Sequence, residues 1–242
     1  MTGAFAGAGQ GGGWAGFALA VAALLIAHSL PARPSFRMWL TGMMGTRAYL
    51  ALYSAVSLLT LGWALLEVTQ APYVPLLPFA IWQSWIPALA MPAAILLAAY
   101  GVAAANPLSI AGRPGGFDPD APGIAGLTRH PVPWAFAVWA GAHALANPDL
   151  AHVLLFGGLA AFALIGMGAL DARLRRRLGQ AEWARLAART SLVPGWALVT
   201  GRWRPRLAPS PRRAAIAVAV WAALVTLHPL VFGASPWPVL PR

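Results

Sequence analysis

Five histidines are the side chains of this sequence best suited to chemistry. They are His28, His130, His143, His152 and His228, in a chain with no cysteine and only six acidic residues. Neutral imidazole binds transition metals and haem iron through a ring nitrogen without burying a net charge. Without cysteine there is no disulfide, no thiolate nucleophile and no thiolate ligand. Any metal or haem bound by this chain is therefore expected to use histidine.

Two of the histidines flank one apolar run. Residues 127–147 read LTRHPVPWAFAVWAGAHALAN, and no charged residue lies between His130 and His143. On one helix the two rings are about 20 Å apart, at about 1.5 Å per residue. They cannot bind the same metal ion, so each needs a partner from another part of the chain.

The other residue types form no catalytic motif. The glycines near the start neither follow a strand nor open a phosphate-binding turn. The acidic residues lie outside the apolar stretches or at their ends, which argues against paired-carboxylate catalysis. A single histidine near a helix end most often hydrogen-bonds a carbonyl or a headgroup. Five of them in a chain so poor in other polar groups favour a functional role for some.

The composition predicts the elements that must position these histidines. Of 242 residues, 59% are hydrophobic and 10% are charged, which is too little polar surface for a soluble globule. Several apolar stretches approach or exceed the roughly 20 residues that a helix needs to cross about 30 Å of hydrocarbon. We therefore expect an all-α fold, a polytopic transmembrane helical bundle of about six spans, in a single domain over residues 1–242.

Prolines and charges bound the expected spans. The third apolar stretch contains Pro87 and Pro92, which permit one kinked span or an interfacial piece followed by a span. Residues 171–213 form the expected cytoplasmic segment. Leu174, Leu178 and Leu186 recur there among arginines, which predicts a basic amphipathic helix along the membrane surface. The spans are placed at about 14–30, 47–66, 79–105, 131–146, 150–170 and 214–232.

The arginines predict the orientation of the bundle. When six spans alternate, every arginine except Arg242 falls in connections on one side of the membrane. The positive-inside rule makes that side the cytoplasm and places both termini outside. The net charge of +11 then reflects topology and calls for no nucleic-acid partner. The first apolar stretch lacks a basic start and a small-residue cleavage site, so it is expected to remain as a span.

Straight spans sort the histidines into two layers. His28 and His130 fall near the cytoplasmic face, whereas His143, His152 and His228 fall toward the outer face. Two axial ligands of one haem need similar depth in the membrane. On depth alone, His28 with His130, or His143 with His228, are the better pairs.

Several motifs occur in an order that resembles the NnrU family of bacterial integral membrane proteins. The resemblance extends over about 17–232 and implies a multi-pass protein of the bacterial inner membrane, associated with denitrification and nitric oxide metabolism. The motifs are HSLP at 28–31, RAYLALYSAVS at 47–57, TRHP at 128–131 followed by WAFAVWAGAH, DAR at 171–173 and LHPL at 227–230.

The plant relatives within this resemblance are the 15-cis-zeta-carotene isomerases, which implies a membrane enzyme with haem b held by histidine. Their ligand positions match His28 and His143, so the resemblance implies these two as axial ligands of the haem iron. The straight-span map puts them at opposite faces, which requires tilted, kinked or longer helices. Position 140 is alanine where those relatives can carry a cysteine, so a redox-switched thiolate ligand is not expected. Isomerase and redox chemistry both stay open.

Two alternatives come from the same residues. The tripeptide Arg129-His130-Pro131, with a charged segment later in the chain, is similar to isoprenylcysteine methyltransferases. That similarity implies S-adenosylmethionine binding, with Arg129 pairing with a carboxylate. The other alternative is a non-catalytic accessory factor for a membrane partner such as a nitric oxide or nitrite reductase. Lipid is the expected environment, and the apolar spans leave open a hydrophobic small-molecule ligand as well. The candidate cofactor-binding residues are His28, His143, His130, Arg129 and His228.

Overall fold

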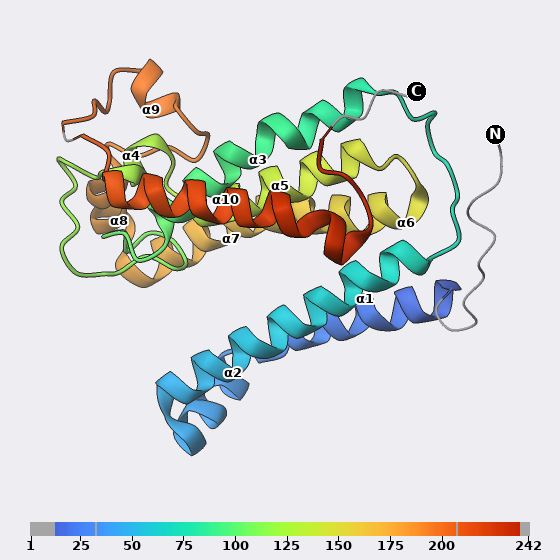
Figure 1. The fold of residues 1–242 in the computed structure, drawn as a ribbon. Coiled ribbons are helices and arrows are strands. Elements are labelled where there is room, and N and C mark those ends of the chain that lie inside the picture. Colours follow the sequence, from blue (N-terminus) through green and yellow to red (C-terminus); the bar gives the residue numbers. More distant parts are fainter. Residues whose placement is uncertain (1–12, 32, 207, 238–242) are drawn as a thin grey trace. The chain divides into compact units, whose positions relative to one another are not determined.

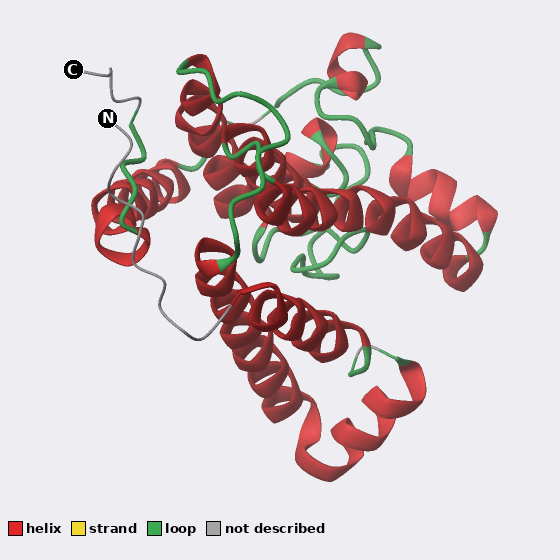
Figure 2. Ribbon diagram, turned by 90° about the vertical axis from the view of Figure 1, so that its right-hand side faces the viewer, coloured by secondary structure: helices red, strands yellow, loops and turns green. Residues whose placement is uncertain are grey.

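Helices form nearly all the regular structure in residues 13–31, 33–206 and 208–237, which are the residues that the structure describes (Figure 1). In this computed structural model those residues contain helices, loops and two isolated bridges, and no β-strand (Figure 2). The expected all-α class is confirmed.

The chain divides into two compact units. The first unit comprises Met1–Leu77 and Asp149–Leu155, and the second comprises Pro78–Pro148 and Phe156–Arg242. The expectation of a single domain over the whole chain stays a prediction.

The first unit is built on a pair of packed helices, α1 (Gly13–Ser29) and α2 (Pro34–Gln70). Pro34 starts α2, where its missing N–H costs no hydrogen bond. Gly45 has φ 79° and ψ 159°, a conformation that glycine tolerates and that kinks α2. The expected second span, 47–66, is the straight part of α2 that follows this kink.

A short stretch after the fifth helix also belongs to the first unit. It contains α6 (Leu150–His152) and the first part of a π-helical turn, η1 (Val153–Gly157). The Leu150 N–H donates to the Val74 carbonyl oxygen at 2.9 Å, which ties this stretch to the segment after α2.

The second unit surrounds one largely buried helix, α5 (Pro131–Ala146). It packs against α3 (Trp82–Gly101) and α7 (Gly158–Leu178), while α10 (Pro211–Phe232) packs against α3 (Figure 1). The buried positions of α5 are mainly alanines, which let neighbouring helices approach closely. The short helices α4 (Ile124–Leu127), α8 (Gln180–Ala187) and α9 (Trp196–Val199) complete the unit.

Four helical segments in the described part of the chain are long and apolar enough to cross a membrane. The helices α1 and α5 are shorter, at 17 and 16 residues, so the count of six spans stays a prediction. The four long segments are mostly exposed in the protein itself, as expected for surfaces that face lipid. They are Pro34–Gln70, Trp82–Gly101, Leu150–Leu178 and Pro211–Phe232.

The basic segment after the fifth span differs from the expected single amphipathic helix. The helix α7 continues to Leu178, and Gly179, with φ 82°, separates it from α8. Leu174, Leu178 and Leu186 belong to a hydrophobic cluster with Leu108. The spacing of these leucines therefore serves packing inside the protein. A location of this segment on the membrane surface stays a prediction. The isolated outer arginine, residue 242, lies outside the described residues.

Candidate functional site

A buried ionic cluster lies in the second unit where α5 begins. Arg129 and His130 form the link between α4 and α5, and Asp171 comes from α7. Arg129 Nη1 donates to Asp171 Oδ2, and His130 Nε2 lies 3.2 Å from Asp171 Oδ1. None of the three side chains is more than 9% exposed. We call Arg129, His130 and Asp171 the Arg129 cluster.

Neutral side chains complete the hydrogen bonding of this cluster. Arg129 Nε donates to Thr190 Oγ1 at 2.9 Å, and the Thr190 hydroxyl donates to the Ala187 carbonyl. His130 Nδ1 lies 3.1 Å from Ser109 Oγ. Ser109 lies in the loop after α3, and Thr190 lies in the loop after α8. The cluster therefore joins the start of α5 to α7 and to these two loops.

The Arg129 guanidinium also contacts an aromatic ring. Its central carbon lies 5.0 Å from the ring centre of Trp183, and that of Arg175 lies 3.9 Å from the same centre. Burial lowers the pKa of Arg129, and the negative charge of Asp171 opposes that effect. Arginine stays protonated in proteins, so a charged guanidinium is held here by a carboxylate, a hydroxyl and an indole ring.

This geometry bears on two of the predicted cofactor-binding residues. Arg129 Nε and Nη1 and both ring nitrogens of His130 have partners within the protein. In the methyltransferase interpretation Arg129 pairs with a ligand carboxylate, and here Asp171 holds that position. The sequence did not reveal Asp171 or Thr190 as partners, although the DAR motif at 171–173 contained the carboxylate. Their role depends on contacts between residues about 40 to 60 positions apart in the chain.

His143 lies in the last turn of α5, within an aromatic setting. Its Nδ1 is 2.8 Å from the Trp139 carbonyl oxygen, which can only accept, so Nδ1 carries a proton. In the neutral ring Nε2 then has the lone pair. The imidazole stacks on Phe156 of η1 with ring centres 5.2 Å apart, and Trp139 lies 5.6 Å away. A π-helical turn such as η1 is frequent at functional sites.

His28 lies in the last turn of α1, in the first unit. Its Nδ1 is 3.3 Å from the Tyr53 hydroxyl, which also lies 3.0 Å from the His28 carbonyl oxygen. Tyr49 stacks on Tyr53 with ring centres 5.9 Å apart and donates to the Pro31 carbonyl. The two tyrosines belong to the RAYLALYSAVS motif, and the sequence had not identified them as partners of the histidine.

The two remaining histidines, like His143, bond to groups close in sequence. His152 Nδ1 lies 2.8 Å from an oxygen of Asp149, the residue that caps α6. His228, another predicted cofactor-binding residue, lies near the end of α10 with Nδ1 2.8 Å from the Ala234 carbonyl oxygen. Within the described residues, no three His, Asp or Glu side chains gather as a metal site would require. His28 and His143 belong to different units, so their pairing stays a prediction.

Comparison with known proteins supplies a family. No curated protein and no solved structure matches the chain. A family model described as NnrU protein matches residues 16–236, which include all five histidines and the Arg129 cluster. Since that match covers most of the sequence, the chain belongs to the NnrU family.

Proposed function

We propose that this NnrU-family membrane protein binds haem b, which His28 and His143 would hold, and acts in nitrogen oxide metabolism during denitrification. The observation that carries the proposal is the setting of His143. Its Nδ1 bonds to the Trp139 carbonyl, and its ring stacks on Phe156.

A hydrogen bond at one ring nitrogen is the usual support for a histidine that binds metal through the other. It fixes the tautomer and the ring orientation, and it raises the basicity of the ligand atom. The carbonyl of Trp139 provides this support within α5. The aromatic rings of Trp139 and Phe156 give the apolar surroundings that suit a porphyrin.

His28 has a setting similar to that of His143. Tyr53 lies within hydrogen-bonding distance of its Nδ1, and the ring centres of the two residues are 5.7 Å apart. In both units, therefore, a histidine in the last turn of an apolar helix has its Nδ1 beside an oxygen and its ring beside an aromatic side chain. His228 shares both features, with Nδ1 beside the Ala234 carbonyl and its ring centre 5.0 Å from that of Phe232, so the choice of His28 and His143 also rests on the family resemblance.

The chemistry comes from the haem. Bound haem b supplies an iron that exchanges one electron or binds a small ligand such as nitric oxide. The residues of this chain would hold the group, orient the imidazole rings and keep the surroundings apolar, and polarity and solvent access are what tune a bound iron.

An absorbance spectrum tests the proposal. The full chain, expressed with ample haem and purified in detergent, is expected to show a Soret band and one haem per chain. His143→Ala is expected to lose the band while keeping a monodisperse elution profile. His152→Ala is the matched control, since its ring bonds to a helix cap in the first unit.

A colourless wild-type protein, even after incubation with added haemin, would overturn the proposal. A Soret band of equal intensity in His143→Ala would remove that residue as a ligand. The accessory-factor alternative predicts a colourless protein that co-purifies with a reductase, so the same preparation separates the two functions.

A further inference from the structure

A cleft of about 860 Å³ opens at the end of α3 in the second unit. Its wall on α3 is apolar and includes Ala93, Leu96 and Leu97. Its other lining comes mainly from the loops after α3 and before α10, with Ile124 and Leu127 of α4 and Pro194. Those loops and the first turns of α10 contribute four arginines, Arg113, Arg204, Arg206 and Arg213, and one acidic residue, Asp118.

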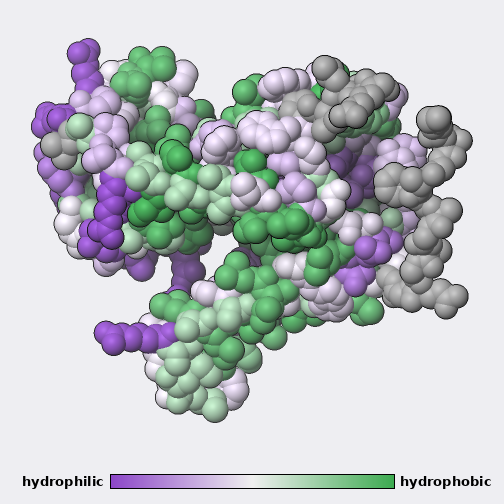
Figure 3. Space-filling model, in the orientation of Figure 1, coloured by the Kyte–Doolittle hydropathy of each residue, from purple (hydrophilic) through white to green (hydrophobic). Residues whose placement is uncertain are grey.

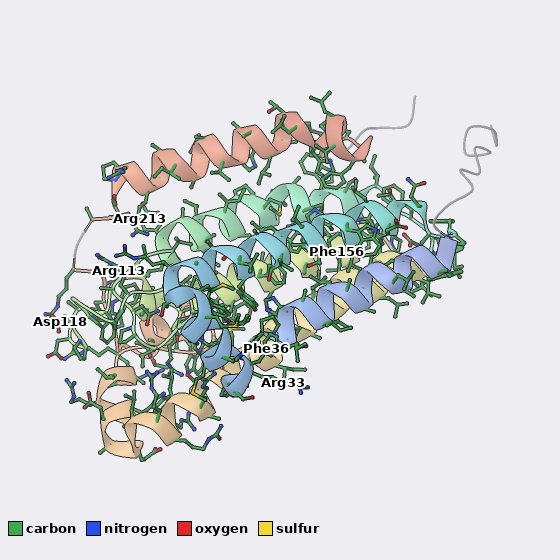
Figure 4. All side chains as sticks on the ribbon, turned by 90° about the horizontal axis from the view of Figure 1, so that it is seen from below. Arg33, Phe36, Arg113, Asp118, Phe156 and Arg213 are labelled. Atoms are coloured by element: carbon green, nitrogen blue, oxygen red, sulfur yellow. The ribbon has the colours of Figure 1, made fainter. Side chains whose placement is uncertain are left out.

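Hydrogen bonds fix the base of the cleft. Arg213 Nη1 donates to the carbonyl oxygens of Ala99 at 2.6 Å and Val102 at 2.9 Å, which satisfies acceptors that the end of α3 leaves unpaired. The Tyr100 hydroxyl donates to the Ser210 carbonyl at 2.7 Å. The end of α3 and the start of α10 are therefore joined, and Figure 4 shows Arg213, Arg113 and Asp118 at the same end of the unit.

The four arginines that line the cleft form its positive rim. They take no part in the ion pairs of the described residues. Those pairs involve other arginines, namely Arg129, Arg185 and Arg189. Arg113, Arg204 and Arg206 are exposed. A positive rim beside an apolar wall selects a molecule with an anionic head and a hydrocarbon tail.

The position of the cleft fits a membrane lipid. Both α3 and α10 are long and apolar enough to span a bilayer, and the cleft lies where α3 ends and α10 begins. Helix ends meet the headgroup layer, where basic pockets between spans bind acidic phospholipids. Hydrophilic residues of the second unit gather at this end, near α4, α8 and α9 (Figure 3).

We propose that this cleft binds one acidic phospholipid of the surrounding bilayer. Its phosphate pairs with Arg113, Arg204 and Arg206, and an acyl chain lies along Ala93, Leu96 and Leu97 of α3. The bound lipid fills the space between α3 and the segment before α10, so it contributes to their packing.

Lipid titration followed by native mass spectrometry tests the site on the full-length protein in detergent. Phosphatidylglycerol is expected to bind at one copy per chain and more tightly than phosphatidylcholine with the same acyl chains. The double variant Arg204→Gln/Arg206→Gln is expected to weaken that binding about tenfold, because each arginine near an anionic lipid contributes attraction.

Three controls distinguish a lipid site from general charge attraction and from a site for free anions. Arg176→Gln/Arg177→Gln removes the same charge from an exposed part of α7 and is expected to leave the affinity unchanged. Ala93→Trp fills the apolar wall without changing charge and is expected to weaken phosphatidylglycerol binding. Glycerol phosphate, which has no acyl chain, is expected not to compete.

Several results would overturn the assignment. Equal weakening by the two double arginine variants would mean that only the general positive field attracts the lipid. Equal affinity for the two lipids would show that the arginine rim does not select an acidic headgroup. Unchanged affinity in Ala93→Trp would show that the apolar wall does not contact the acyl chain. Competition by glycerol phosphate would identify a site for free anions.

Discussion

At the scale of single residues, Asp171 is the side chain on which the Arg129 cluster depends. Asp171→Asn keeps the shape of the side chain but leaves the buried guanidinium without a counter-ion. Breaking a buried ion pair from one side costs about 3 kcal/mol. We therefore expect the variant to unfold at a clearly lower temperature in detergent, measured by loss of the monodisperse peak in size-exclusion chromatography after heating.

Glu182→Gln is the matched control for that change. It breaks a carboxylate–arginine pair with Arg185 on α8, but both of those side chains are well exposed. Exposed pairs contribute little to stability, so the midpoint temperature is expected to stay at the wild-type value. Equal losses in the two variants would contradict the structural role assigned to Asp171.

His130 gives a second test at this scale. The sequence placed it among the candidate cofactor-binding residues, whereas the structure shows both of its ring nitrogens beside protein oxygens. His130→Gln is expected to lower thermal stability and to leave the haem content per folded chain unchanged. Loss of haem from a protein that still elutes as a single peak would make His130 a candidate ligand again.

At the scale of elements, the loop between α3 and α4 depends on close backbone approach. A Cβ added at Gly112 would overlap the Asn106 carbonyl oxygen. The Asn106 side chain in turn donates to the Arg129 carbonyl at 2.9 Å. Gly112→Ala must therefore shift the backbone of this loop, which the Asn106 side chain connects to Arg129.

We expect Gly112→Ala to destabilise the protein by about 1–3 kcal/mol, the usual range for overpacking. Thermal unfolding in detergent provides the measurement. Gly115→Ala, in the same loop, adds its methyl group to open space and is expected to unfold as the wild type does. If the two alanine variants behave alike, the close approach at Gly112 is not what holds this loop.

The sequence pattern predicted one helix boundary correctly and another incorrectly. The apolar stretch predicted a third span to residue 105, but α3 ends at Gly101. Arg213 caps the carbonyl groups there, and Ala103 takes a positive φ of 51°. That end is set by a contact with α10, more than 100 residues away. The start of α5 was predicted correctly because Pro131 marks it locally.

The same distinction applies to the candidate site. The RHP motif indicated Arg129 and His130, since residue type and local spacing were enough. Their partner Asp171 lies 42 residues from Arg129, and no periodicity connects the two. The aromatic neighbours of His143 divide in the same way. Trp139 follows from helical spacing, but Phe156 reaches the ring only through packing.

At the scale of the whole molecule, the arginine distribution predicts one orientation in the membrane. The natural chain has no cysteine, so a single introduced cysteine reports its own side without background. Tyr73 is exposed in the connection after α2, and Gly115 is exposed in the loop after α3. The positive-inside rule places the first outside and the second in the cytoplasm.

We expect a membrane-impermeant maleimide to label Tyr73→Cys in intact cells, and to label Gly115→Cys only after the membrane is permeabilised. Labelling of both positions before permeabilisation, or the reverse pattern, would contradict the predicted topology. The experiment also tests whether an odd number of spans separates the two positions.

The decisive measurement for the proposed haem site is the haem content of variants in which one histidine at a time is replaced by alanine. The wild type and alanine variants at positions 28, 130, 143, 152 and 228 are purified in parallel, and haem per chain is measured from the absorbance of the pyridine complex. We expect one haem per chain in the wild type, loss in His28→Ala and His143→Ala, and retention in the other three. Haem lost from a different pair, or absent from the wild type, would contradict the assignment of His28 and His143 as ligands.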